Sequence, residues 1–432
     1  MFDNFHRLTD VRVNRRGVIG RRDFLGTVSA SAAVAGTLNW PALMTARADD
    51  LRQRGMACIL LWMQGGPSQL ETFDPKPGHA NGGETKAIET SVPGIRISEN
   101  LPNVARAMDD ICLIRSMNGR EGSHPRATHL MQTGYLPTAS VKYPSIGAHA
   151  ANQLADRSFD LPSYVRIGRG RGSYGGGLLG VEFDPFLMAS ATRVPDNTTV
   201  SHGDNRYRRR LGLLGKLESH YEQHGGRQEV GDHRKLVNAA SRMVLSPRMD
   251  VFDIEQEPEN VRQAYGDSEF GAGCLLARRL VETGATFVEV HAGNWDTHDD
   301  NFNRVRDLCT QVDQPHAALL ADLKQRGMLD RTLVVWAGEF GRTPKINPRS
   351  GRDHYPRAYS AALAGAGVKG GQVIGETDAG GESIKDRPVG VSDFLRTLCQ
   401  ALGLDADIEH MSNIGRPIKV VDGGEVVREV FG

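Results

Sequence analysis

The stretch TFVEVHAGNWDTH (residues 286–298) joins an apolar run to a polar end. Short apolar runs that stop at turn residues are typical of buried strands, so TFVEVH predicts a strand of a central sheet. Asp296 and His298 follow this run and are separated by one residue. In an extended chain, side chains at this spacing point to the same side and can reach one ligand. The stretch therefore predicts a buried strand with a carboxylate and an imidazole at its carboxyl end.

The rest of the chain repeats this alternation of short apolar runs and polar segments. Helix-like periodicity separates the runs, and buried strands that alternate with helices predict an α/β fold. We expect a mostly parallel central sheet with helices on both faces and an irregular helical insertion at about residues 168–265. The other predicted strands are 56–63, 111–117, 161–167 and 332–337. The predicted helices are 126–133, about 206–222, 233–245, 268–283, 300–326 and 391–402.

Side chains that can bind a metal gather where the predicted strands end. Ligands of such sheets bind outside the carboxyl ends of the strands, so these side chains are expected at one edge. Carboxylates and neutral imidazoles without thiolates suit zinc or manganese, and calcium is a third candidate among divalent metals. The candidate ligands are Glu71, Asp296, His298, Glu339 and His354, with His124 close to them.

Each candidate ligand also has a purely structural interpretation. Asp296 and Thr297 are residue types that cap helices, and a helix is expected from about Asn301. His298 could be a surface histidine, and Glu339 could pair with Arg342. Single motifs are weak signals, so only the convergence of several strand ends favours the metal site.

Residues 1–48 differ in character from the rest of the chain. Arg21 and Arg22 precede a weakly apolar stretch, and Ala46-Arg47-Ala48 is a small-x-small pattern suited to signal peptidase. An arginine pair before a weak apolar segment resembles a twin-arginine export signal. We therefore expect a signal peptide over residues 1–48, a mature chain from Asp49 with no transmembrane segment, and a periplasmic or otherwise exported location.

Charge and cysteine content exclude several classes of protein. Without the seven arginines and three aspartates of residues 1–48, the 52 basic and 52 acidic side chains become 45 and 49. This slightly acidic balance argues against a nucleic-acid partner. Five cysteines without C-x-x-C spacing exclude a zinc knuckle and argue against a disulfide framework. The composition does not predict an oligomeric state.

Several motifs together resemble the alkaline phosphatase and sulfatase superfamily. TLVVWAGEFGRTP (332–344) resembles its strand-then-acid signature, NWDTH its metal-binding aspartate and histidine, and GRDHYP (351–356) its later histidine. HPRATHLMQTGYLP (124–137) is similar to the segment that carries the sulfatase nucleophile. Within the superfamily, these motifs and GGPSQLETFDPKPG resemble an uncharacterised, twin-arginine-exported, sulfatase-like bacterial family. The resemblance covers about residues 20–402 and implies a single sulfatase-like α/β domain over residues 49–432.

The resemblance implies a metal-dependent hydrolase of sulfate or phosphate esters, with a sulfated polysaccharide as a candidate substrate. His124 stands at the nucleophile position, with Ser123 beside it and one residue out of register. Arg126 would hold the anionic group, because a guanidinium matches sulfate or phosphate oxygens. Arg342 and Arg352 could also receive such an anion, although each could equally be a surface arginine paired with an acid.

Two departures from the superfamily keep other functions open. Gln64-Gly65-Gly66 stands where active sulfatases carry paired aspartates, and His124 replaces a cysteine or serine. One alternative is a non-catalytic protein that binds a glycan or an envelope partner. Another is a metal-dependent mutase or phosphotransferase.

Overall fold

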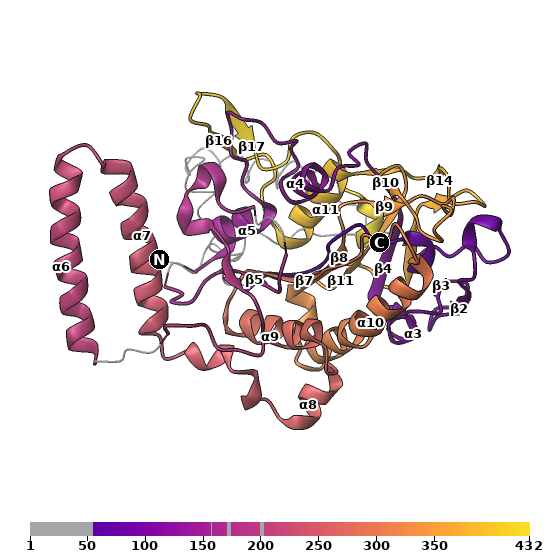
Figure 1. The fold of residues 1–432 in the computed structure, drawn as a ribbon, viewed down its shortest axis with the longest axis horizontal. Coiled ribbons are helices and arrows are strands. Elements are labelled where there is room, and N and C mark those ends of the chain that lie inside the picture. The colour runs from indigo at the N-terminus through magenta and orange to yellow at the C-terminus, as the bar shows by residue number, and fades with distance from the viewer. Residues whose placement is uncertain (1–54, 157, 171–173, 199–202) are drawn as a thin grey trace, which may run out of the picture. The chain divides into compact units, whose positions relative to one another are not determined.

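A nine-stranded, mostly parallel sheet runs through the part of the protein that the computed structural model describes, namely residues 55–156, 158–170, 174–198 and 203–432 (Figure 1). Its strand order is β12-β4-β11-β8-β1-β7-β5-β6, with β15 beside β4. The strands are β1 (Ala57–Met63), β4 (Ile111–Asn118), β5 (Tyr164–Ile167), β6 (Phe186–Met188), β7 (Phe287–Ala292), β8 (Thr332–Ala337), β11 (Tyr359–Ala364), β12 (Gln372–Ile374) and β15 (Val389–Gly390).

Strand β1 lies in the middle of the sheet, and its sequence explains why. All seven residues of ACILLWM are buried, as expected for a strand covered on both faces. It pairs in parallel with β7 on one side and with β8 on the other, so that Leu61 lies opposite Val290 and Trp336. The carboxyl ends of these three strands therefore meet at one edge of the sheet, as the sequence predicts.

Strand β11, which the sequence analysis does not find, is antiparallel and lies between β4 and β8. Its sequence, YSAALA, consists mostly of alanine and serine and lacks the β-branched residues that mark strands. Because β11 runs opposite to both neighbours, β4 and β8 run in the same direction. The fold class is thus the predicted one, and β4 also ends at the edge where β1, β7 and β8 end.

Helices cover both faces of the sheet (Figure 1). Helices α9 (Glu269–Thr283) and α10 (Asn301–Gln325) lie along one face, with α9 packed on β7 and β1. Helices α4 (His124–Thr133), α5 (Ile146–Leu154) and α11 (Val391–Leu402) lie along the other. Ser145 caps α5 by accepting a hydrogen bond from the Ala148 amide at 3.1 Å.

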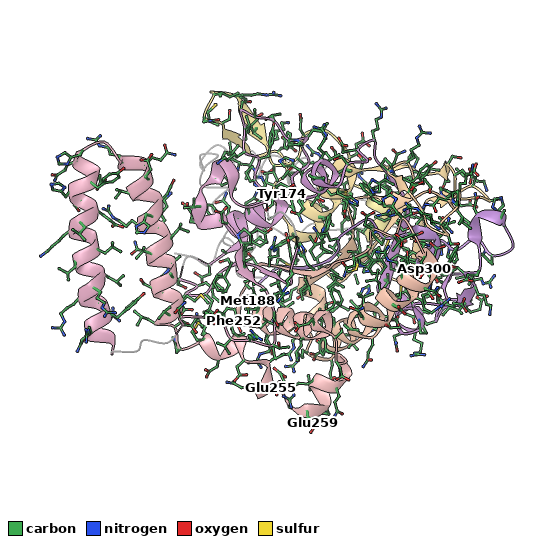
Figure 2. All side chains as sticks on the ribbon, in the orientation of Figure 1. Tyr174, Met188, Phe252, Glu255, Glu259 and Asp300 are labelled. Atoms are coloured by element: carbon green, nitrogen blue, oxygen red, sulfur yellow. The ribbon has the colours of Figure 1, made fainter. Side chains whose placement is uncertain are left out.

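The segment 168–265, expected as an irregular helical insertion, contains long helices and also contributes a strand to the sheet. It contributes edge strand β6 and two long helices that pack on each other, α6 (Asp204–Gln223) and α7 (Arg227–Val244), followed by α8 (Glu259–Ala264). Met188 and Phe252, which are labelled in Figure 2, belong to the main hydrophobic core, and the Phe252 ring lies 6.0 Å from that of Phe186 in β6. The segment is therefore anchored to the sheet through apolar contacts.

The remaining elements are short and lie around the sheet. The additional helix is α3 (Pro102–Arg106), and the small paired strands are β2 (Ala87–Glu89) with β3 (Arg96–Ser98), β9 (Gly341–Arg342) with β10 (His354–Tyr355), β13 (Glu376–Thr377) with β14 (Ile384–Asp386), and β16 (Glu409–Met411) with β17 (Pro417–Lys419).

Three further expectations concern the chain as a whole. All five cysteines are buried and free of disulfides, in agreement with the absence of a disulfide framework. Within the described residues, none of the helices combines the length and apolar character needed to cross a bilayer. The expected signal peptide, residues 1–48, lies outside the described residues.

Candidate metal centre

The structure brings five predicted side chains together at the carboxyl edge of the sheet. Asp296 and His298 follow β7, Glu339 follows β8, and His124 begins α4 shortly after β4. His354 lies in β10, which pairs with β9, and β9 begins shortly after Glu339. Four segments that are far apart in the sequence thus contribute to one polar cluster.

Three imidazoles of the cluster are oriented in the same way, with Nδ1 directed at an oxygen atom. A carboxylate or carbonyl oxygen can only accept a hydrogen bond, so we assign the proton of each neutral ring to Nδ1. Each Nε2 then keeps its lone pair, the form in which imidazole binds a metal. The three pairs are His124 with Glu339 Oε1 at 2.7 Å, His298 with Asp353 Oδ1 at 2.8 Å and His354 with the Gly122 carbonyl at 2.8 Å.

The Nε2 atoms of these rings gather around the Asp296 carboxylate. Oδ1 lies 3.0 Å from His298 Nε2 and 3.3 Å from His354 Nε2, and Oδ2 lies 3.3 Å from His124 Nε2. The Nε2 atoms of His298 and His354 are themselves only 3.0 Å apart. Ligands at about 2.0–2.1 Å from a tetrahedral zinc are roughly 3.3 Å from one another, so this spacing is compatible with a metal site.

Three residues satisfy the geometry of a shared cation most fully. The ligand atoms of His124, Asp296 and His354 all lie within 4.8 Å of one another. His124 Nε2 and Glu339 Oε2 are buried and have no hydrogen-bond partner among the described residues. Buried polar atoms without a partner are uncommon and call for an ion or a water. The donor set therefore fits a metal ion, with His298 adjoining on the side of His354.

The pKa values of His124 and His354 are shifted in opposite directions. Burial lowers the pKa of His124, but the hydrogen bond with Glu339 and the charges of Glu339 and Asp296 outweigh it, and the pKa is raised. For His354, burial dominates and lowers the pKa despite the bond to the Gly122 carbonyl. The negative field at His124 favours any cation, whether a proton or a metal.

Arg342 supplies a fixed positive charge beside Asp296. Its guanidinium is fully buried and donates to Asp296 Oδ1 at 2.6 Å, to the Gly66 carbonyl at 2.8 Å and to the carbonyls of Gly65 and Arg352. Burial raises the pKa of Asp296, but the bond and charge of Arg342, with the charges of the neighbouring histidines, lower it to about 2. Asp296 is therefore a carboxylate at neutral pH.

The predicted nucleophile and anion-binding residues lie at the rim of this cluster. Ser123 is exposed, and among the described residues its hydroxyl makes no hydrogen bond. Arg126 is also exposed and donates from Nε to Glu121 Oε2 at 2.6 Å. This bond is the main reason that the pKa of Glu121 is lowered. Neither side chain contacts the metal-binding atoms, and their chemical roles stay predictions.

Glu71 is the one predicted ligand that the structure does not bring into the cluster. Its carboxylate is fully buried and forms a two-pronged ion pair with Arg352, at 2.9 Å from Nε and 2.7 Å from Nη2. Arg352 is therefore not a surface arginine, as one interpretation had it, and it has no donor directed at the cluster. The sequence could not reveal this pair, because its two residues lie 281 positions apart.

The structural alternatives for the other candidates also find no support. Helix α10 begins at Asn301, but its N-cap is Asp300, so Asp296 and Thr297 do not cap it. Glu339 hydrogen-bonds with the Gly65 amide and with His124, whereas Arg342 pairs with Asp296. Asp353, which the sequence places beside His354, orients His298.

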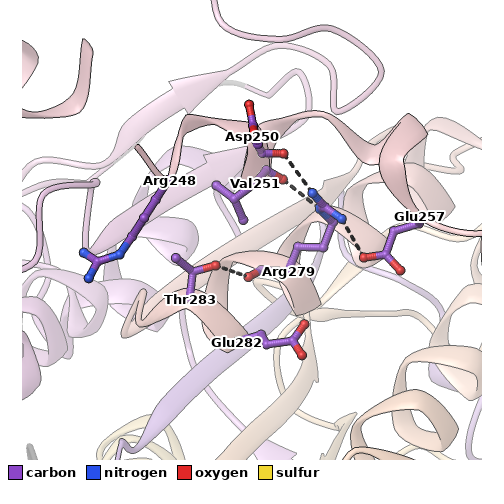
Figure 3. A pocket seen from close by; sticks show the side chains of 7 residues that line it. All are labelled: Arg248, Asp250, Val251, Glu257, Arg279, Glu282 and Thr283. Atoms are coloured by element: carbon purple, nitrogen blue, oxygen red, sulfur yellow. Dashed lines mark hydrogen bonds and ion pairs between the residues drawn. The ribbon is translucent and has the colours of Figure 1, made fainter. Parts of the chain in front are cut away.

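A surface cavity of about 300 Å³ lies at the other end of the strands (Figure 3). Glu282 and Thr283 line it and precede the start of β7, whereas the cluster follows the end of β7. Arg279 in this cavity already donates to Glu257 at 2.6 Å and to two backbone carbonyls. The cavity thus offers a ligand little unused hydrogen-bonding capacity. Its lining is Arg248, Asp250, Val251, Glu257, Arg279, Glu282 and Thr283.

Sequence comparison assigns the chain to a family. Residues 56–431 match the family described as protein of unknown function (DUF1501), and the chain belongs to that family. No curated protein sequence is significantly similar to the chain.

Solved structures similar to this chain include sulfatases and members of the alkaline phosphatase superfamily. The sulfatase PsFucS1 from Pseudoalteromonas sp. is 12% identical with a TM-score of 0.41, and the alignment covers 84% of this chain and 72% of that one. The lipoteichoic acid synthase LtaP from Listeria monocytogenes is 10% identical with a TM-score of 0.41, covering 87% and 80%. An alkaline phosphatase superfamily protein from Vibrio parahaemolyticus is 12% identical with a TM-score of 0.38, covering 83% and 75%.

Proposed function

We propose that the protein is an exported, metal-dependent hydrolase of sulfate or phosphate esters. The observation that carries the proposal is the convergence of three imidazole Nε2 atoms on the Asp296 carboxylate, with every Nδ1 held by an oxygen. Two unprotonated nitrogens at 3.0 Å repel each other unless a cation lies between or beside them. This arrangement serves metal binding and has no comparable use in packing.

The donor set favours zinc, with manganese as a second choice. Imidazole nitrogens and a carboxylate are common zinc ligands, whereas calcium prefers six to eight oxygen ligands. A divalent ion held by His124, Asp296 and His354 would supply a Lewis acid that polarises the ester and lowers the pKa of water. His298 and Glu339 would complete or orient this ligand set.

The chain's own residues would then position the ester. Arg126 is exposed on the first turn of α4, next to the ligand His124, and can exchange its partner Glu121 for a sulfate or phosphate oxygen. The buried Arg342 holds Asp296 in the orientation in which its oxygens face the imidazoles. Ser123 lies between Gly122 and His124, both in contact with the cluster, and is the candidate nucleophile or proton-transfer group.

The substrate and the location follow from the motifs of the chain. The sulfatase-like motifs favour an anionic ester on a polysaccharide as substrate. The arginine pair Arg21-Arg22 and the cleavage pattern at residues 46–48 favour export by the twin-arginine route.

Metal analysis combined with hydrolysis assays tests the proposal. We expect the purified exported protein to carry a divalent metal in stoichiometric amount and to hydrolyse an aryl sulfate or an aryl phosphate. Asp296→Asn should remove both the metal and the turnover. A wild-type protein without bound metal, or turnover that Asp296→Asn leaves unchanged, contradicts the proposal.

One observation favours a second function, the binding of a glycan or an envelope partner without catalysis. An activated serine forms a hydrogen bond with a base. Among the described residues, the Ser123 hydroxyl makes no such bond. Calorimetry with sulfated oligosaccharides separates the two functions. Binding without turnover, unchanged in Ser123→Ala, supports the binding protein.

A further inference from the structure

Glu71 forms a buried ion pair at the base of the cluster without touching the metal-binding atoms. Glu71 and Arg352 are both 0% exposed, and the guanidinium meets the carboxylate in a two-pronged arrangement. Replacing a buried ion pair by apolar residues often costs no stability, so its presence calls for a reason other than stability. The contacts of its two members indicate what that reason is.

Arg352 fixes the segment that carries His354. Beyond Glu71, its guanidinium donates to the carbonyls of Asn81 at 2.7 Å, Thr343 at 3.1 Å and Pro344. Every guanidinium nitrogen is thereby used. Asp353 and His354 follow Arg352 directly, so the position of the imidazole depends on this anchored residue.

The other side of Glu71 holds the segment that carries Asp296 and His298. Glu71 Oε2 accepts a hydrogen bond from Asn301 Nδ2 at 2.8 Å, and Asn301 Oδ1 accepts one from the Thr297 hydroxyl at 2.6 Å. Thr297 stands between Asp296 and His298, and both Thr297 and Asn301 are 0% exposed. A chain of two buried hydrogen bonds thus connects Glu71 to the middle of the NWDTH segment.

The two segments are also joined to each other. The Arg352 amide donates to the Thr297 carbonyl at 3.1 Å, and the Arg352 carbonyl accepts from Arg342 at 3.2 Å. Gln69, in the same 3-10 helix as Glu71 (Gln69–Glu71), binds the backbone of Arg342 twice, at 2.8 and 2.9 Å. One short helix therefore supports both arginines that adjoin the cluster.

We infer that Glu71 is a positioning residue, which sets the affinity of the cluster for its metal by holding the two ligand-bearing segments in register. The inference rests on the proposed function, because it assumes that the cluster binds a metal. Residues that orient metal ligands typically change metal affinity by about 10- to 100-fold when they are replaced. Glu71 reaches the ligand-bearing segments only through other residues, so we expect its replacement to lower the metal affinity by about 10-fold, the lower end of this range.

The test is the substitution Glu71→Gln, which keeps the volume and removes the charge. We would measure the Zn²⁺ dissociation constant of the apoprotein by competition with a chromophoric chelator, and thermal unfolding in parallel. The expected result is a dissociation constant raised by about 10-fold, with turnover restored when the metal is in excess. Glu257→Gln is the matched control, because Glu257 pairs with the buried Arg278 at 2.9 Å, away from the cluster. That variant should lose stability but keep the wild-type Zn²⁺ affinity.

A Glu71→Gln protein that is destabilised like the control but binds Zn²⁺ as the wild type does overturns the inference. If Glu71→Gln does not fold, Asn301→Ala serves as the deciding variant, because it removes the connection between Glu71 and Thr297 and leaves the ion pair of Glu71 with Arg352 in place. Weaker Zn²⁺ binding in Asn301→Ala supports the inference, and unchanged binding rejects it. A wild-type protein that binds neither Zn²⁺ nor Mn²⁺ overturns both the inference and the proposed function. A wild type that binds Zn²⁺ without hydrolysis rejects only the hydrolase.

Discussion

The substitution Glu339→Gln should separate metal binding from stability. Glu339 is almost fully buried, yet only one of its oxygens has partners: Oε1 accepts from the Gly65 amide at 3.0 Å and interacts with His124 Nδ1 at 2.7 Å. Oε2 is buried without a partner among the described residues. A glutamine can keep both contacts through its carbonyl oxygen, with its amide group in the place of Oε2.

The magnitudes follow from these contacts. Two charge-assisted hydrogen bonds become neutral ones, which costs about 2 kcal/mol in all, since the former are worth about 1.5–3 and the latter about 0.5–1.5 kcal/mol each. Removing a buried charge with an unpaired oxygen regains a similar amount. The free energy of unfolding of the apoprotein should therefore change by no more than about 1 kcal/mol. Metal affinity should fall by about 10- to 100-fold, because His124 loses the carboxylate that orients it and raises its basicity.

Two measurements on the same preparations test this separation. Urea unfolding of the metal-free protein gives the change in stability, and calorimetric titration with Zn²⁺ gives the change in affinity. Glu121→Gln is the control, because Glu121 pairs with the exposed Arg126 and should change neither quantity. A Glu339→Gln protein that loses more than about 2 kcal/mol and binds Zn²⁺ like the wild type would refute the reasoning.

Three further predictions concern other parts of the molecule. Burial and the nearby His410 lower the pKa of His149 to about 3, so the unfolded state, with a histidine pKa of about 6.5, binds the proton first as the pH falls. The free energy of unfolding should therefore decrease below pH 6.5, and His149 should account for about 2 kcal/mol of the decrease at pH 5. In urea unfolding, the His149→Leu protein should show a decrease that is smaller by this amount. Ser123→Ala should lower the metal-dependent turnover of an aryl ester, because Ser123 is the proposed nucleophile or proton-transfer group. Turnover at the wild-type rate would remove Ser123 from the mechanism. The five buried cysteines, with burial raising the pKa of Cys112 to about 12, should react with a thiol reagent only after unfolding, as absorbance during a urea titration would show.

The sequence predicted the parts of the site that depend on strand ends. Asp296, His298 and Glu339 lie in the segments that follow β7 and β8, and the parallel pairing of both strands with β1 places their carboxyl ends at one edge. Local sequence patterns are sufficient for such residues, because the strand itself determines where the next residues lie.

The parts that the sequence did not predict depend on contacts between distant segments. Glu71 also follows a strand, but its carboxylate turns toward Arg352, and no local pattern distinguishes these two directions. The Gly122 carbonyl that holds His354 is a backbone atom, which any residue type could supply. Strand β11 was missed because alanine and serine carry little strand preference, so its neighbours β4 and β8 determine its conformation.

Under the proposed function, the charges around the three imidazoles match those of a divalent ion. The carboxylates in direct contact with the rings are Glu339, Asp296 and Asp353, and the Arg342 guanidinium contacts Asp296. Three negative charges and one positive charge leave an excess of two negative charges. The ion pairs of Glu71 with Arg352 and of Glu121 with Arg126 are each neutral and do not change this excess. One divalent cation would neutralise this excess. Without it, the cluster would repel a sulfate or phosphate ester, so binding of the ester and binding of the metal should be coupled.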